Sequence, residues 1–370
     1  MRPRTAVVVV SALALATAAV GCGGDDPDHL AAGDDFSVEA ALAELPVPDE
    51  DGPGLTVAVF DLEAAAEAND AGERPDADAD DVREWFSTAT GFTTESGEDF
   101  PPIFVASVET LGGNQLASLD EIRSELGWTF LDVDAVAEVL TPPYRFGVVA
   151  GDVGPETLED AGLDEAEDGV FIVGEGEEGE VDPDDATPAR PLGSPLRTAA
   201  EDGRLVVSSS SDAVADWVGG EPASLAEDDD LRAVAAALDD ADAVSAYLTT
   251  ALPGADGGER TTPDEADAFP LKEQLVALGI GWAAEDGESR MVVVYAFESE
   301  ESAETAADQV EAAYEATSTI TRTPISDQLA LDEVEVDGTV VVAHVHPGPE
   351  GRPQSPLAML QRRDVPFVLG

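Results

Sequence analysis

The chain has 370 residues, of which 80 are acidic and only 17 are basic, so its formal charge at pH 7 is −63. This charge excludes nucleic acid as a partner, because phosphate binding requires clusters of Lys and Arg that the sequence lacks. Hydrophobic residues still make up 43% of the chain, so it can bury a core and is not a disordered acidic polymer. The dispersed carboxylates predict a halophile-like surface that repels itself less at high salt and binds divalent cations weakly.

An apolar run from Ala6 to Val20 follows the basic start of the chain and ends in Gly21-Cys22. This is the layout of a secretory signal segment, and the run is shorter than the about 20 residues that a membrane-spanning helix needs. Val20-Gly21-Cys22 resembles the lipobox of bacterial lipoproteins, although Ala19 stands where that family prefers Leu. The resemblance implies that residues 1–21 are a lipoprotein signal peptide and that a lipidated Cys22 begins the mature chain. The alternatives are an ordinary signal peptide with an incidental cysteine, and an uncleaved anchor.

Cys22 is the only cysteine, so the fold must be held by packing and not by disulfides. Removal of residues 1–21 leaves 15 basic against 80 acidic side chains, a formal charge of −65. Residues 22–36 are rich in Gly and Asp without periodicity, which predicts a flexible acidic tether. Beyond it we expect a first α+β unit with a long insertion at 37–222, and a second α+β unit at 223–370.

The two expected units repeat one order of elements. The first has expected strands at 55–62, 144–150, 170–173 and 205–208 and helices at 154–162 and 212–218. The second has expected strands at 243–248, 290–297 and 339–346 and helices at 300–316 and 356–362. We interpret the repeat as a duplicated antiparallel-sheet unit with helices on one face. The alternative is that any α+β chain repeats a strand-helix-strand order by chance. The insertion covers 64–140, and Ser-Leu-Ala-Glu at 224–227 predicts a capping box ahead of a helix between the units.

Motifs that often mark catalysis fail in their context. Residues 174–179 match the dinucleotide pattern G-x-G-x-x-G, but three glutamates there would meet the pyrophosphate and prolines follow where a helix must begin. The sequence has no phosphate-binding P-loop, no G-x-S-x-G and no S-x-x-K, and the serines at 208–211 are placed to cap a helix. With 80 carboxylates, a glycosidase-type pair cannot be singled out. We therefore predict no catalytic residue and no cofactor.

His344 and His346 form the sharpest candidate site, and they are two of only three histidines. Alternate residues of a strand point to the same face, so the two imidazoles do. A two-residue turn at 337–338 would place Glu333 and Glu335 on that face as well. Two imidazoles beside carboxylates are a ligand set for zinc or a similar ion. The simpler interpretation, which we favour, is the wet face of an amphipathic hairpin.

The lipobox, the tether and acidic segments such as 224–229 resemble exported lipoproteins of actinobacteria. That resemblance carries no catalytic motif and so implies no activity. We expect a lipid-anchored protein on the extracytoplasmic side of the cell membrane, bound to the membrane through Cys22. Its role would be a non-catalytic binding or envelope-structural module whose protein or small-molecule ligand is unknown. The alternative is an extracytoplasmic hydrolase that depends on carboxylates or a metal.

Overall fold

The fold was obtained as a computed structural model of the whole chain. The residues that it describes are 29–48, 54–76, 79–92, 100–106, 108, 110–111, 118–142, 144–167, 169–201, 203–220, 223–252 and 273–367. The signal segment, Cys22 and the first part of the expected tether lie outside these residues.

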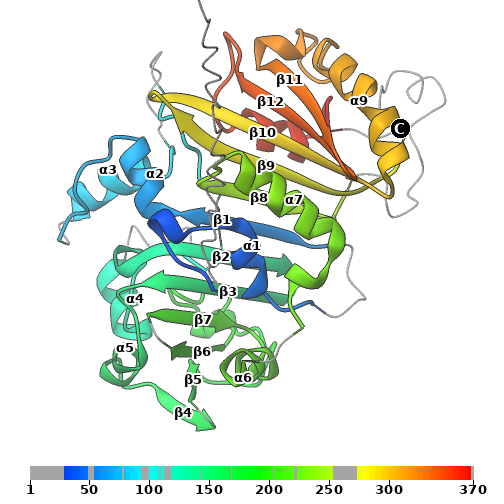
Figure 1. Cartoon of the computed structure of the whole chain (residues 1–370). Coiled ribbons are helices and arrows are strands. Elements are labelled where there is room, and N and C mark those ends of the chain that lie inside the picture. The colour runs from blue at the N-terminus through cyan, green and yellow to red at the C-terminus, as the bar shows by residue number, and fades with distance from the viewer. Residues whose placement is uncertain are drawn as a thin grey trace, which may run out of the picture.

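One continuous antiparallel sheet organises the described chain (Figure 1). Its twelve strands have the order β11-β12-β10-β9-β8-β1-β2-β3-β7-β6-β5-β4. Their bounds are β1 Thr56–Asp61, β2 Val133–Thr141, β3 Tyr144–Gly151, β4 Asp164–Glu167, β5 Val170–Val173, β6 Leu196–Glu201, β7 Arg204–Ser208, β8 Ser245–Thr249, β9 Leu275–Glu285, β10 Glu288–Phe297, β11 Leu329–Asp337 and β12 Val340–Pro347. The expected α+β class is confirmed.

The topology repeats on the two sides of the β1–β8 pair, which is antiparallel. On one side the sheet runs β1-β2-β3-β7-β6, and on the other it runs β8-β9-β10-β12-β11, so each strand has a counterpart with the same neighbours. One helix precedes β1 and another precedes β8. In the same way, β3 and β10 are each followed by a helix of their own. The first half adds β5 and β4 at its outer edge. The predicted insertion ends earlier than expected, because β2 already begins at Val133.

Helices cover both faces of this sheet, whereas the sequence suggested one face. Their bounds are α1 Val38–Ala43, α2 Leu62–Ala68, α3 Ala79–Ala89, α4 Leu119–Leu126, α5 Pro155–Asp160, α6 Ser211–Gly219, α7 Asp229–Asp240, α9 Glu300–Tyr314 and α10 Ser355–Gln361. In Figure 1, α1 and α7 cross the face of the sheet that is turned to the viewer. Side chains of α1, α6 and α7 belong to one hydrophobic core, and those of the other six helices belong to the core on the opposite face.

The reason for two covered faces lies in the central strands. β10 is buried at every position from Met291 to Phe297, with side chains alternating between the two cores. A strand that is apolar on both faces must be covered on both, since exposed apolar surface costs free energy. α7 lies very close to β9 at Gly279, where an added Cβ would stand 2.4 Å from Cγ1 of Val234. That contact explains why a strand interior carries glycine.

Buried carboxylates fasten the N-terminal segment to the sheet. Residues 29–36 were expected to be flexible tether, but Leu30 is only 1% exposed. The backbone N–H of Gly33 donates to Oδ2 of Asp61 at 2.6 Å. The N-terminus of α1 is held by Asp239, whose carboxylate accepts from the backbone N–H of Val38 at 2.7 Å and from two further donors. The described chain therefore joins the hydrophobic core at residue 30, several positions before the expected end of the tether.

The described residues contain no helix that is both long enough and apolar enough to cross a membrane.

Candidate functional site

The two histidines lie at the end of β12, beside the edge strand β11. His344 pairs with Val292 of β10 on one side and with Glu333 of β11 on the other. His346 pairs with Ala330 of β11. Both imidazoles are partly exposed, and both lie on the same face of the sheet as Val342, which is buried in the core beneath α7. On β12 this face is therefore exposed to solvent only toward the histidines, whereas on β11 Glu333 and Glu335 are both exposed.

The hairpin turn is shifted by one residue from the expected position. Gly338 and Thr339 form the turn, and Asp337 pairs with Val340. This shift moves every cross-strand partner by two residues, so each side chain keeps its predicted face. Glu335 faces Val342 and Glu333 faces His344. The expected face of the two glutamates agrees with this register.

A β-bulge in the edge strand β11 changes which carboxylate meets His346. Leu331 pairs with Val345 and Glu333 pairs with His344, which leaves Asp332 as the extra residue. Nδ1 of His346 lies 2.9 Å from Oδ2 of Asp332, and the two side chains are 46% and 41% exposed. The imidazole that was expected to face Glu333 or Glu335 is thus held by Asp332. A bulge re-aims one side chain in this way and is not readable from residue alternation.

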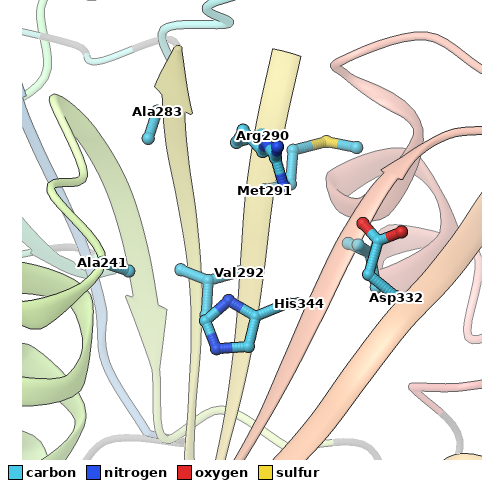
Figure 2. Close-up of a pocket in the computed structure, with 8 residues that line it drawn as sticks. Ala241, Ala283, Arg290, Met291, Val292, Asp332 and His344 are labelled. Carbon is cyan, nitrogen blue, oxygen red and sulfur yellow. The ribbon is translucent and has the colours of Figure 1, made fainter. Parts of the chain in front are cut away.

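A small surface recess opens beside these residues (Figure 2). His344, Asp332, Arg290 and Val292 line it, with alanines and other apolar side chains between them. Figure 2 shows His344 against Val292 and Asp332 on the neighbouring strand. The recess has a volume of about 50 Å³. Pockets for small molecules measure roughly 300–1,000 Å³, so this one has room for a few water molecules only.

The charged groups around the recess already have partners within the protein. Arg290 bonds Oε2 of Glu285 at 2.6 Å, and its side chain is 53% exposed. In the described residues, no three His, Cys, Asp or Glu side chains are arranged so that they could hold a metal ion. His344 and His346, with Glu333 or Glu335, were the candidate ligands for zinc or a similar ion, and the described residues bring no such set of three together.

Chemically, the recess is lined by the imidazole of His344, and beside it the imidazole of His346 is held by the carboxylate of Asp332. A His–Asp pair of this kind can accept a proton, but a nucleophile or an activated water must also be placed within hydrogen-bond reach. Ser289 lies on β10 and has a buried hydroxyl without a hydrogen-bond partner. Its position alternates with Arg290 along β10, so it faces the opposite side of the sheet. The pair has no nucleophile from this strand.

Other titratable groups are buried for structural reasons that the sequence did not reveal. Glu44 is 6% exposed and bonds both Arg204 and the indole N–H of Trp217, the latter at 2.7 Å. Asp61 is fully buried, and burial raises the pKa of its carboxyl despite hydrogen bonds from backbone N–H groups. Burial likewise raises the pKa of Asp239. These carboxylates hold the chain's own backbone and arginines.

Comparisons with known proteins give no relative for this chain: no family model matches it, and neither do curated proteins or solved structures.

Proposed function

We propose that the chain is a lipid-anchored protein of the extracytoplasmic membrane surface, and that it acts as a non-catalytic binding or envelope-structural module. The anchor would be Cys22, the only cysteine, which follows the apolar run in the arrangement of a lipobox. Two acyl chains make membrane attachment stable, because each buried CH₂ contributes about 0.8 kcal/mol and a single chain is marginal.

The role of the buried carboxylates is the observation that carries the non-catalytic part of the proposal. In an active site, carboxylates with shifted pKa values line a cleft and face the substrate. Here Asp61 and Asp239 face backbone N–H groups, and Glu138 accepts from the backbone and hydroxyl of Thr110. Asp364 is bound in the same way by Ser318 and Thr319. Each of these groups stabilises a chain segment, as expected for a scaffold.

The acidic surface indicates the class of ligand. A net charge of −65 on the mature chain attracts cations and repels anions over distances near the Debye length. Weak binding of divalent cations should therefore be measurable by calorimetry at low salt and should vanish at high salt. Binding that survives high salt would contradict a delocalised surface interaction and would indicate a specific site.

The anchor is tested by expressing the wild type and Cys22→Ser and fractionating the cells. We expect the wild type in the membrane fraction with an N-terminus at Cys22 and a mass increased by the lipid, and the variant released from it. Wild-type protein that is free in the medium and begins at Gly23 or later would refute the anchor.

The alternative function, a hydrolase, is supported by one observation, the His346–Asp332 pair at 2.9 Å. It is separated from the first proposal by Asp332→Asn and His346→Gln. A hydrolase would lose turnover of ester or phosphoester substrates in both variants. A binding module would show no turnover above buffer in the wild type and in either variant.

A further inference from the structure

Four exposed arginines in the described part of the second half form no ion pair, and one of them, Arg352, packs over the ring of Phe100 instead. Arg322, Arg362 and Arg363 are exposed, and among the described residues none of them forms an ion pair. Arg83 in the first half is likewise exposed without an ion pair to a described residue, so the distinguishing feature of Arg322, Arg362 and Arg363 is that they lie together. Six other arginines each bond a carboxylate: Arg74, Arg123, Arg190, Arg204, Arg232 and Arg290.

Hydrogen bonds bring the three arginines to one place in the fold. The backbone N–H of Arg322 donates to the carbonyl of Ser318 at 3.2 Å. The hydroxyl of Ser318 donates to Asp364, which directly follows Arg362 and Arg363. The carboxylate of Asp364 also accepts from the backbone N–H of Thr319 at 2.8 Å and is 2% exposed. Asp364 therefore connects the segment that contains Arg362 and Arg363 to the loop that begins at Ser318, because its carboxylate accepts hydrogen bonds from that loop.

The backbone at two of these arginines is in the left-handed region. Arg322 has φ of +63° and Arg363 has φ of +55°. The other described non-glycine residues with positive φ are all aspartates, which tolerate this conformation better than arginine does. A strained residue persists where the surrounding structure imposes it, and such positions concentrate at functional sites. Arg363 closes the C-terminus of α10, where the backbone N–H of Asp364 donates to the carbonyl of Met359 at 3.0 Å. Arg322 has no such helix end to close, so its strain marks this loop independently of its charge.

An exposed apolar side chain lies in the same loop. Ile320 is 54% exposed, and the loop closes behind it through a hydrogen bond from Ser318 N–H to the carbonyl of Thr323 at 2.8 Å. We call Ile320, Arg322, Arg362 and Arg363 the arginine patch. An apolar side chain flanked by basic residues is typical of surfaces that lie in the membrane interface. Guanidinium groups bind phosphate oxygens with two parallel hydrogen bonds.

We propose that the arginine patch binds the phosphate headgroups of anionic lipids and holds the second half of the sheet against the membrane. The proposal builds on the proposed lipid anchor, which keeps the patch near the bilayer and so raises its effective concentration there. The rest of the acidic surface is repelled by the same headgroups, so the two effects together would fix one orientation of the protein on the membrane.

The test uses the mature chain with Cys22→Ser, so that binding does not depend on the lipid. Sedimentation with vesicles of phosphatidylcholine is compared with sedimentation with an equal mixture of phosphatidylcholine and phosphatidylglycerol at low salt. We expect binding to the anionic vesicles only, and a loss of about fivefold in partition for each arginine removed in Arg322→Gln, Arg362→Gln and Arg363→Gln.

The matched control removes three exposed arginines that are already paired with carboxylates. Arg123, Arg232 and Arg290 have side chains that are 51%, 49% and 53% exposed, and changing each to Gln alters the net charge by the same amount. We expect this control to bind at least half as well as the parent. Equal losses in the patch variant and the control, or equal binding to both vesicle types, would overturn the proposal.

Arg322→Gly separates the guanidinium from the backbone strain. Glycine relieves a positive φ, so the variant should unfold at the same or a higher temperature while its vesicle binding falls. Unchanged binding in this variant would overturn the role of Arg322. Patch-dependent self-association in light scattering, without vesicle binding, would assign the patch to an acidic protein surface and overturn lipid binding. Neither result affects the fractionation test of Cys22.

Discussion

Glu44→Gln should destabilise the protein far more than the loss of a surface ion pair. Oε1 of Glu44 bonds the guanidinium of Arg204 and the backbone N–H of Leu30, and Oε2 accepts from the indole N–H of Trp217. In the Glu44→Gln variant one of these two oxygens is replaced by an NH₂ group. Whichever way the amide is turned, this donor faces another donor, either the indole N–H or the pair formed by Arg204 and Leu30.

The magnitude follows from burial. The side chains of Glu44 and Arg204 are 6% and 18% exposed, and Nε of Arg204 is buried without a hydrogen-bond partner. Breaking one partner of a buried ion pair costs about 3–5 kcal/mol, and we expect the lower end because Arg204 keeps some contact with water. At about 2 °C per kcal/mol for a chain of this size, the melting temperature should fall by roughly 6 °C.

The measurement is urea unfolding, because guanidinium chloride would screen the charges under study. The matched control is Asp229→Asn, which breaks the ion pair with Arg232 on α7, where the side chains are 86% and 49% exposed. An exposed pair contributes only about 0–1 kcal/mol. Removing the buried cation as well, in Glu44→Gln with Arg204→Met, should recover about 1–3 kcal/mol of the summed losses. If Glu44→Gln costs no more than Asp229→Asn, or the double variant is fully additive, the buried ion pair is not what holds this segment.

Four further outcomes are expected. Val341→Asp should lower the free energy of unfolding by several kcal/mol, because Val341 is fully buried. His344 is partly exposed, so His344→Ala should cost less than about 1 kcal/mol in the same urea titration. Equal losses in the two variants would contradict the face assignment. Gly279→Ala should cost about 1–3 kcal/mol by overpacking against Val234, and adding Val234→Ala should relieve part of that loss. Burial raises the pKa of Asp61, so the folded chain binds a proton on this carboxyl more tightly than the unfolded chain does. The stability should therefore rise as the pH falls from 7 through that pKa. If the thermal midpoint of Asp61→Asn changes with pH as steeply as that of the wild type, this reasoning is wrong. The thermal midpoint should also rise more in 1 M NaCl than in sucrose of comparable exclusion, because salt screens the net charge of the chain; an equal rise would mean that the carboxylates are already neutralised.

The predicted elements that the structure reproduces are those with a clear period or cap. The helix expected at 300–316 is α9, with Ser299 as its N-cap and a buried stripe that includes Ala303 and Val310. β2 and β9 went unpredicted, and they occupy equivalent places in the two halves. β9 is buried on both faces from Ala277 to Trp282, so it lacks the alternation that indicates a strand. Continuous burial of this kind depends on helices that pack from elsewhere in the chain.

Local caps were predictable only where one residue decided them. Ser-Leu-Ala-Glu at 224–227 indicated a capping box, but these residues form a 3₁₀ turn and Asp228 caps α7 instead. Both choices satisfy the first backbone N–H groups of a helix, and the sequence could not rank them. At the candidate site, the face of His344 and His346 was predictable from alternation. The bulge that brings Asp332 to His346 was not, because it depends on the pairing between strands.

The symmetric centre of the sheet has a consequence for how the chain can change. Two equivalent halves that meet through one antiparallel strand pair have the geometry of a two-fold symmetric dimer joined into a single polypeptide. In a true homodimer every substitution appears twice, so a strained arginine or a buried charge must be tolerated in both subunits. Fusion removes that restriction. The buried Glu44–Arg204 pair occurs in the first half alone, and the left-handed arginines at 322 and 363 occur in the second alone. One half is thereby free to secure the N-terminal segment while the other carries the proposed arginine patch, which the first does not need to copy.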